Sequence, residues 1–359
     1  MMARKRVVLS ILKIAAVCAA LVLFFLLLSW GQKTWDPYTV RILNLCGIYI
    51  GITLGLNLCN GFTGQFSLGI AGFMAVGAYT TALLTMAPEI KQAVYFIEPL
   101  IYPLNSIQWG FFPALLMAAV VSGIVGFLVG APAIRFRGDY LAITTLGFAE
   151  IIRVVFTNIV PITNGALGLK GIPPHTDLVW SWGFALICIA IMARLMKSSF
   201  GRALKAIRDD EIAAEAMGVN LFSHKCLAFV LSAMMAGVGG GLLGNLITTI
   251  DPNMFRFPLT FTVLMMAVLG GLGSITGTVI SAVLVTVAME ALRALEEPRV
   301  IFGLALPGIP GMRMVVFSIA LMIVILFFPK GFMGDREISL DRAKRFATRL
   351  CRTNTSRQG

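Results

Sequence analysis

Residues 258–290 read PLTFTVLMMAVLGGLGSITGTVISAVLVTVAME, an apolar run with one interruption. As a single helix of about 1.5 Å per residue the run would measure about 50 Å, whereas the hydrocarbon core of a membrane is about 30 Å thick. The interruption is GGLGS at 270–274. The sequence therefore predicts two short membrane spans that meet at this glycine break.

The same apolar character extends over most of the chain. Hydrophobic residues make up 58% of the 359 residues and charged residues 13%, against about 25% charged residues in soluble domains. Further apolar runs, each near the roughly 20 residues that a spanning helix needs, lie at 8–29, 40–60, 66–86, 109–131, 139–159, 178–196, 225–249 and 313–328. We expect an all-α polytopic membrane protein with about ten crossings and glycine-interrupted segments, not a β-barrel of short alternating strands. Residues 1–329 would form the transmembrane domain and 330–359 a basic tail.

The basic residues indicate the orientation. The net charge is +12, and with ten crossings most of the 29 Lys and Arg residues fall on one side of the membrane. Lys and Arg are retained on the cytoplasmic side, so both termini are expected there, and the first apolar run is expected to be an uncleaved span. Arg41 would then lie outside, and Glu290 would lie at the end of a span, in water.

One loop, 197–224, is unusually polar for this chain. It contains SFGRALKAIRDDEIAAEAMGVN at 199–220, in which Arg202, Lys205 and Arg208 form a stripe at helical spacing. Apolar residues follow another flank of the same segment. We therefore expect a short amphipathic helix that begins at Ser199.

The charge then reverses at Asp209, Asp210 and Glu211. Carboxylates are favoured at a helix N-terminus and disfavoured at a C-terminus. This pattern predicts a second short helix, capped by Asp209, containing Glu215 and closed by Gly218. Two rigid charged helices could dock a soluble partner, or they could simply connect two spans, and the residues alone leave both interpretations open.

Four segments together resemble the permease subunits of branched-chain amino acid ABC importers. They are GFTGQFSLGIAGFMAVGAYTTALL at 61–84, RGDYLAITTLGFAEIIRVV at 137–155, ITNGALGLKGIPP at 162–174, and the polar loop with its continuation LAFVLSAMMAGVGGGLLG. The resemblance covers residues 40–328. The chain departs from the family at Ile70, where relatives usually carry histidine, and in the 86–108 loop, which leaves the substrate open.

The resemblance implies a type II importer fold of about ten helices in the bacterial inner membrane. It also implies a second similar permease, two cytoplasmic ATPases and a periplasmic substrate-binding protein as partners. By this resemblance, Arg202 through Gly218 would bind in a groove of the ATPase. The chain has no G-x-x-x-x-G-K-[ST] motif, the phosphate-binding loop of many ATPases. We therefore expect that it is not an enzyme, that it binds no cofactor, and that the partner subunits use the ATP.

Polar residues within the apolar runs are candidates for a substrate path. Glycines permit broken or closely packed helices, and side-chain hydroxyls and amides there offer polar contacts. The candidates are Thr63, Gly64, Gln65 and Ser67, followed by Thr144, Thr145 and Asn164. Close helix packing accounts equally for the glycines, and hydroxyls commonly bond to their own helix.

Few ionisable or metal-ligating residues suggest a catalytic, metal-binding or proton-coupled function. Glu150 and Arg153 are spaced to form an ion pair within one span, near the membrane face. His175 and His224 fall on opposite sides of the membrane, and the six cysteines have no metal-binding spacing, so no metal site is expected.

We therefore expect the membrane subunit of an ATP-driven importer of branched-chain amino acids that works by alternating access. A related permease for urea, short amides or a sugar remains an alternative. So does a secondary carrier, which would need ionisable groups at the bilayer midplane and no docking loop.

Overall fold

The structure is a computed structural model of the 359-residue chain. It describes residues 19, 21–96, 98–136, 138–293, 299–301, 304–306, 311, 315–316, 318–319, 322, 326 and 331. Most of the predicted first span, most of the predicted span at 313–328 and nearly all of the predicted tail at 330–359 lie outside the described residues.

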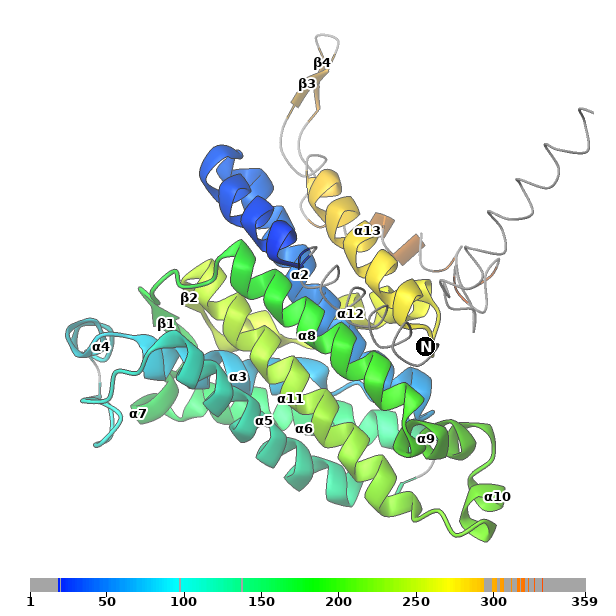
Figure 1. Cartoon of the computed structure of the whole chain (residues 1–359). Coiled ribbons are helices and arrows are strands. Elements are labelled where there is room, and N and C mark those ends of the chain that lie inside the picture. The colour runs from blue at the N-terminus through cyan, green and yellow to red at the C-terminus, as the bar shows by residue number, and fades with distance from the viewer. Residues whose placement is uncertain are drawn as a thin grey trace, which may run out of the picture.

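The described part is a bundle of helices (Figure 1). Six of its helices are long and apolar enough to cross a membrane. They are α2 (Pro37–Asn57, extended by a π-helix, η1, Leu58–Phe62), α5 (Phe111–Ala133), α6 (Asp139–Asn158), α8 (Leu178–Lys197), α11 (Leu221–Ile247) and α13 (Ile275–Arg293). The multi-pass helical architecture predicted from the sequence is thereby confirmed.

Three apolar helices are shorter. The helix Leu21–Thr34 precedes α2, and α12 spans Phe257–Gly270. The third, α3 (Ile70–Thr85), is followed by α4 (Pro88–Val94) at a bend of 119°. In the run predicted as a span at 66–86, residues 66–69 form an irregular loop and the helix begins only at Ile70.

Short elements connect these helices. They are α7 (Val160–Thr163), η2 (Gly165–Leu167), β1 (Leu169–Lys170), α9 (Ser199–Asp209), α10 (Glu211–Ala216), β2 (Thr249–Ile250), η3 (Pro252–Phe255), β3 (Arg299–Ile301) and β4 (Leu304–Leu306). Strand β1 pairs antiparallel with β2, Leu169 opposite Ile250, and β3 pairs antiparallel with β4.

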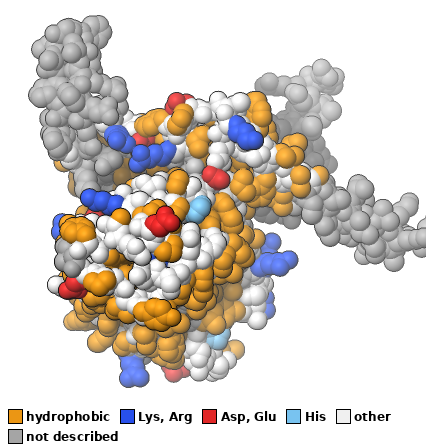
Figure 2. Space-filling view, turned by 90° about the vertical axis from the view of Figure 1, so that its left-hand side faces the viewer, with side chains coloured by type: hydrophobic (Ala, Val, Ile, Leu, Met, Phe, Trp, Pro, Cys, Tyr) orange, Lys and Arg blue, Asp and Glu red, His pale blue; other side chains and the backbone are white. Residues whose placement is uncertain are grey.

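The bundle has two distinct ends. The α9 end carries α9 and α10, and the β1 end carries β1, β2 and α4 (Figure 1). Helix α11 runs from α10 at the first end to β2 at the second. Figure 2 views the β1 end, where scattered charged side chains lie among backbone and non-hydrophobic side chains while hydrophobic side chains gather along the flanks, as expected of a bundle that crosses a membrane.

The centre of the bundle depends on close backbone contact between α3 and α11. A Cβ added to Gly77 would lie 1.9 Å from the Gly237 carbonyl oxygen, and one added to Gly240 would lie 2.0 Å from the Met74 carbonyl oxygen. Only glycine fits at such distances. Lipid supplies no hydrophobic driving force for the association of helices. Small residues let the two backbones approach closely, and the dispersion contacts made at this distance hold the helices together.

The predicted glycine break is confirmed. Helix α12 ends at Gly270 and α13 begins at Ile275, and between them Gly271 and Gly273 have φ values of 102° and 93°. The two helices return against each other, with the Ser281 hydroxyl donating to the Met266 carbonyl at 2.5 Å.

Asn57, at the end of α2, connects that helix to the break. Its amide nitrogen donates to the Ser274 carbonyl at 3.1 Å and to the Thr278 hydroxyl at 2.6 Å, and its amide oxygen accepts from the Gly273 N–H at 2.9 Å. The side chain is fully buried. A single side chain therefore satisfies the backbone where the helix is interrupted.

Replacing Asn57 with alanine should destabilise this junction, because the partly buried Gly273 N–H loses its acceptor. Such a loss costs about 1–3 kcal/mol. We expect a lower melting temperature in detergent and faster amide hydrogen exchange at 271–274 in N57A. The matched control is N158A, since the exposed Asn158 only donates to the Val154 carbonyl of its own helix. Equal exchange in the two variants would contradict this role.

Candidate functional site

The candidate site begins where α2 changes from an α-helix to the π-helix η1. The wider turn displaces backbone carbonyls from their usual partners, and π-helical turns occur frequently at functional sites. Here the Thr63 hydroxyl donates to the Leu58 carbonyl at 2.8 Å, and the Gln65 N–H donates to the Cys59 carbonyl at 3.0 Å. The chain thus leaves the helix with these carbonyls satisfied.

The loop after η1, residues 63–69, is fixed by two polar side chains. Asn60 donates to the Ser67 carbonyl at 3.2 Å and accepts from the Ser67 N–H at 3.1 Å. Thr145 of α6 accepts from the Leu68 N–H at 3.0 Å. The loop is therefore attached both to η1 and to the beginning of α6.

Gln65 is buried, and its amide nitrogen is a donor without a partner. Its amide oxygen lies 3.4 Å from the Cys59 sulfur. An unpaired buried donor is uncommon and costly, which marks the loop interior as a place with unused hydrogen-bonding capacity.

Helix α9 packs directly against this broken segment. The Arg208 guanidinium donates to the Gly61 carbonyl at 3.4 Å, and the Lys205 ammonium lies 6.0 Å from the centre of the Phe62 ring. Gly64 has a φ of 73°, and a Cβ at this position would lie 3.2 Å from Cγ of Arg208. The predicted docking loop and the predicted path segment, far apart in the sequence, are therefore in contact.

Caps and tertiary contacts fix the geometry of α9 and α10. Ser198 caps α9 by accepting from the Gly201 N–H, and Leu204 and Ile207 are buried beneath it. Gly218, with a φ of 84°, donates to the Glu215 carbonyl at 2.9 Å just after α10. Both helices form where the sequence pattern predicted them.

The predicted cap of α10 is wrong by one residue. Asp209 ends α9, and Asp210 caps α10 by accepting from the Ile212 and Ala213 N–H groups at 2.9 and 3.1 Å. The physical reason is the backbone, since Asp210 is extended whereas Asp209 is still helical. Asp209 instead lies 3.3 Å from the Arg208 guanidinium.

Helix α10 is also attached to α11. Glu211 and Lys225 form an ion pair at 2.5 Å, and the Lys225 side chain is largely buried. Two large apolar side chains, Ile212 of α10 and Met217 directly after it, are 76% and 84% exposed. Arg202, Lys205 and Glu215 are exposed charged groups of the same two helices.

The other candidate path residues do not all gather at this site. Thr144 donates to the Tyr140 carbonyl of its own helix, as hydroxyls commonly do. Asn164 follows α7, at the end of α6 opposite to Thr145, and has the left-handed φ of 59°. Its amide nitrogen donates to the Gly168 carbonyl, which fixes a tight turn. The structure thus brings together Thr63, Gly64, Gln65, Ser67 and Thr145 but not Asn164.

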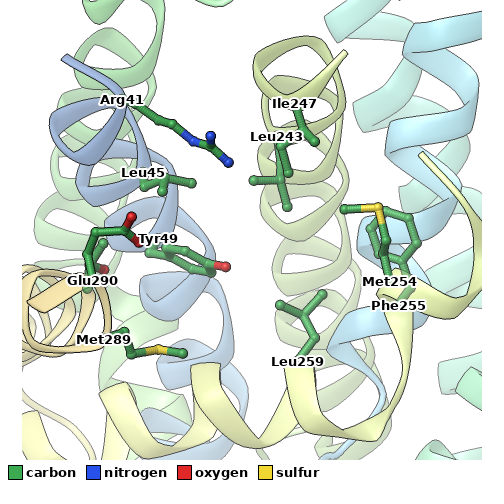
Figure 3. A pocket seen from close by; sticks show the side chains of 11 residues that line it. Arg41, Leu45, Tyr49, Leu243, Ile247, Met254, Phe255, Leu259, Met289 and Glu290 are labelled. Carbon is green, nitrogen blue, oxygen red and sulfur yellow. The ribbon is translucent and has the colours of Figure 1, made fainter. Parts of the chain in front are cut away.

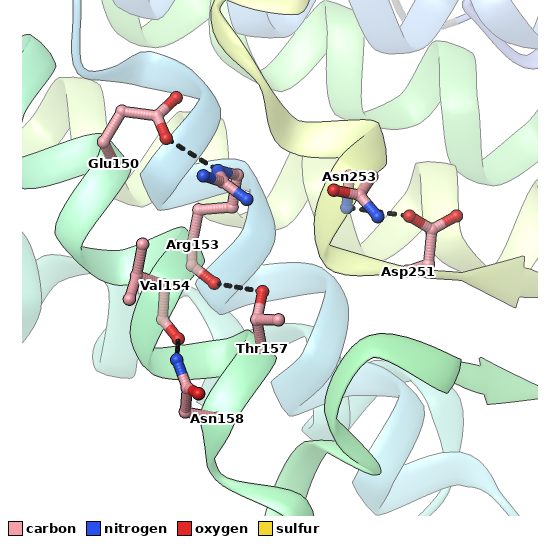
Figure 4. A network of polar contacts seen from close by, with 7 residues as sticks. All are labelled: Glu150, Arg153, Val154, Thr157, Asn158, Asp251 and Asn253. Carbon is pink, nitrogen blue, oxygen red and sulfur yellow. Dashed lines mark hydrogen bonds and ion pairs between the residues drawn. The ribbon is translucent and has the colours of Figure 1, made fainter.

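Glu150 and Arg153 form the ion pair that their spacing predicted, with Nε and Oε2 2.6 Å apart (Figure 4). The Glu150 side chain is 41% exposed in the isolated chain. The histidines lie at opposite ends of the bundle, His175 against Phe111 and His224 stacked on Phe200 of α9. Among the described residues, no group of three or more His, Cys, Asp or Glu residues is placed to hold a metal ion.

Sequence analysis missed Asn57 and Asn60. The sequence did indicate that both side chains make polar contacts, because an asparagine inside an apolar run must find a hydrogen-bond partner within the protein. What the sequence did not contain was the identity of that partner.

Comparison with known proteins agrees with this architecture. The model of the family described as "Branched-chain amino acid transport system / permease component" matches residues 38–326. The LivM protein of Salmonella typhimurium, a high-affinity branched-chain amino acid transport system permease protein, is 34% identical over 293 residues. That match covers 72% of this chain and 64% of LivM, so the chain spans less than two thirds of the length of this relative.

Two further relatives extend the comparison. A probable branched-chain amino acid transport permease protein LivM of Methanocaldococcus jannaschii is 25% identical over 322 residues, which are 81% of this chain and 92% of that protein. The permease protein LivH of Salmonella typhimurium is 33% identical over 162 residues, 45% of this chain and 48% of LivH. Because the family model matches most of the chain, this chain belongs to the family of branched-chain amino acid transport system permease components.

Proposed function

We propose that the chain is the membrane-spanning subunit of an ATP-driven importer that moves branched-chain amino acids across the bacterial inner membrane by alternating access. Family membership and the names of its relatives support the transport role and the substrate class. The observation that carries the mechanism is the contact between α9, on an exposed end of the bundle, and the broken segment that follows α2.

The proposed assembly contains a second permease, two cytoplasmic ATPases that bind the ATP, and a periplasmic substrate-binding protein. The likeness to both LivM and LivH supports a pairing of two related permeases. In this assembly the α9 end and both termini lie in the cytoplasm, the β1 end faces the binding protein, and the whole chain has about ten spans in a type II arrangement.

The ATPases would dock on α9 and α10. Ile212 on α10 and Met217 directly after it are exposed, and the ends of this segment are fixed by Asp210 and Gly218. Exposed apolar side chains on a rigid element favour burial against a partner. The Glu211–Lys225 pair would transmit a displacement of α10 to α11.

Helix α9 would transmit the same displacement to the broken segment. Arg208 contacts Gly61 and packs beside Gly64, and the loop beyond them is attached to α6 through Thr145. Alternating access requires a rigid element that moves between two arrangements. The path past Thr63, Gln65 and Ser67 would open and close as this segment moves.

A second permease would cover the exposed face of α6. A charged side chain in contact with lipid is costly, and such groups normally face protein or water. The partly exposed Glu150 and its partner Arg153 therefore favour a protein partner or an aqueous path beside this helix.

The docking role predicts that charge on α10 abolishes import. In proteoliposomes that contain both permeases, the ATPases and the binding protein, leucine should accelerate ATP turnover and be taken up. The double variant I212D/M217D should lose at least about tenfold of this uptake and fail to retain the ATPases on purification, because burying carboxylates in an apolar contact is costly. The matched control I212L/M217L should retain both properties. Uptake by the chain without ATPases, driven by an ion gradient alone, would contradict the proposal.

If α9 transmits its displacement through the contact with Gly64, a side chain at this position should uncouple ATP hydrolysis from leucine import. Alanine there must accept a positive φ and displace Arg208, whereas alanine at Gly138, whose φ is 59°, meets no atom within 4 Å. Both substitutions place alanine at a positive φ, which costs on the order of 1–3 kcal/mol. We expect G64A to assemble and hydrolyse ATP but to import several-fold less leucine per ATP than G138A. An equal ratio of uptake to hydrolysis in the two variants would disprove the role of this contact.

A further inference from the structure

A cavity of about 210 Å³ lies between α2, α11, α13 and the segment η3–α12 (Figure 3). Leu243 and Ile247 place it at the last turns of α11, about 33 Å along that helix from its beginning at α10. The cavity is therefore at the β1 end, remote from α9. Its volume is below the roughly 300–1,000 Å³ of drug-sized pockets, so it suits only a small molecule.

The wall of the cavity is mainly aliphatic. Its apolar side chains include Leu45, Leu243, Ile247, Met254, Leu259 and Met289. They come from α2, α11, η3, α12 and α13 and surround one volume (Figure 3). An alkyl chain would be accepted against these side chains because its apolar surface is removed from water, and the hydroxyl-bearing Tyr49 and Thr286 also line the cavity.

Two opposite charges line the same cavity. The exposed Arg41 guanidinium, from the first turns of α2, reaches across the opening toward α11 (Figure 3). It has no hydrogen bond or ion pair with the residues that the structure describes. A guanidinium of this kind can bind a carboxylate through two parallel hydrogen bonds.

Glu290, in the last turn of α13, supplies the negative charge. Sequence analysis placed it in water, but its side chain is only 13% exposed because it is packed between α13 and α2. Its partner among the described residues is Arg293, 3.2 Å away, whose side chain is 47% exposed. A mostly buried carboxylate with one exposed partner can accept further hydrogen bonds from a ligand ammonium.

From this arrangement we infer that the cavity binds a free aliphatic α-amino acid, with Arg41 on its carboxylate, Glu290 on its ammonium and the alkyl chain against the aliphatic wall. Such a zwitterion carries both charges on one carbon atom next to an alkyl chain, which matches the lining group by group. The inference rests on the proposed function for its ligand, and it adds a substrate site within the permease, at the end that faces the binding protein.

The cavity is also connected to the break at 271–274. Its walls α2, η3–α12 and α13 are the elements that Asn57 joins at the 271–274 break. A displacement of that junction would therefore change the shape of the cavity.

The test measures binding of radiolabelled leucine to the purified importer without the binding protein. Arg41→Gln and Glu290→Gln should each weaken leucine binding by about tenfold to a hundredfold, the value of a charge-assisted hydrogen bond. The matched control is Arg256→Gln, because Arg256 is a basic residue of the same end that does not line the cavity. Its binding should equal that of the unmodified protein.

Two analogues assign the charges. Leucinamide lacks the carboxylate, so Arg41→Gln should not weaken its binding; 4-methylpentanoate lacks the ammonium, so Glu290→Gln should not weaken its binding. If the unmodified importer and both variants bind leucine equally, or if none binds it, the cavity is not the site, even where ATP-driven uptake proves the proposed function. If binding follows the prediction but uptake is absent, the site stands and the proposed function fails.

Discussion

Within a membrane every backbone N–H and C=O group must find its hydrogen-bond partner inside the protein, and two breaks in the helices make this constraint decisive here. At 271–274 the partner is Asn57, which reaches the break from α2. At 58–69 the partners are Asn60, Thr63 and Thr145, with Arg208 contributing from α9. Each break is therefore also a junction between elements far apart in the sequence, because Asn57, Thr145 and Arg208 reach these breaks from other helices.

This arrangement gives the bundle a mechanical route from one end to the other. Helix α9 contacts the break at 58–69, which begins directly after Asn57 at the end of α2. Asn57 in turn joins α2 to α12 and α13, which line the cavity at the β1 end. Glycine contacts between α3 and α11 form a rigid centre beside this route. Helix α9 and the loop at 63–69 that it contacts should therefore move together, while the long helices move as rigid bodies beside them.

The sequence predicted the features that depend on local pattern. The glycine break at 270–274, the helices α9 and α10 and the terminating Gly218 follow from run length, charge order and glycine position. Asp210 rather than Asp209 caps α10 because the backbone angle decides among adjacent acidic residues. Asn57, whose partners lie more than two hundred residues away, and the shared cavity of Arg41 and Glu290 could not be predicted, since they depend on how the helices pack.

The central claim is that α9 and the loop at 63–69 move as one body when ATP binds to the partner subunits. Ala206 on α9 and Phe66 in the loop are both exposed, so each can be replaced by cysteine and carry a spin label with little disturbance. The direct measurement is the distance between the two labels by electron paramagnetic resonance, in the nucleotide-free and the ATP-trapped importer. The account predicts one unchanged distance in both states, and a separation that shifts by several ångströms on ATP binding would contradict it.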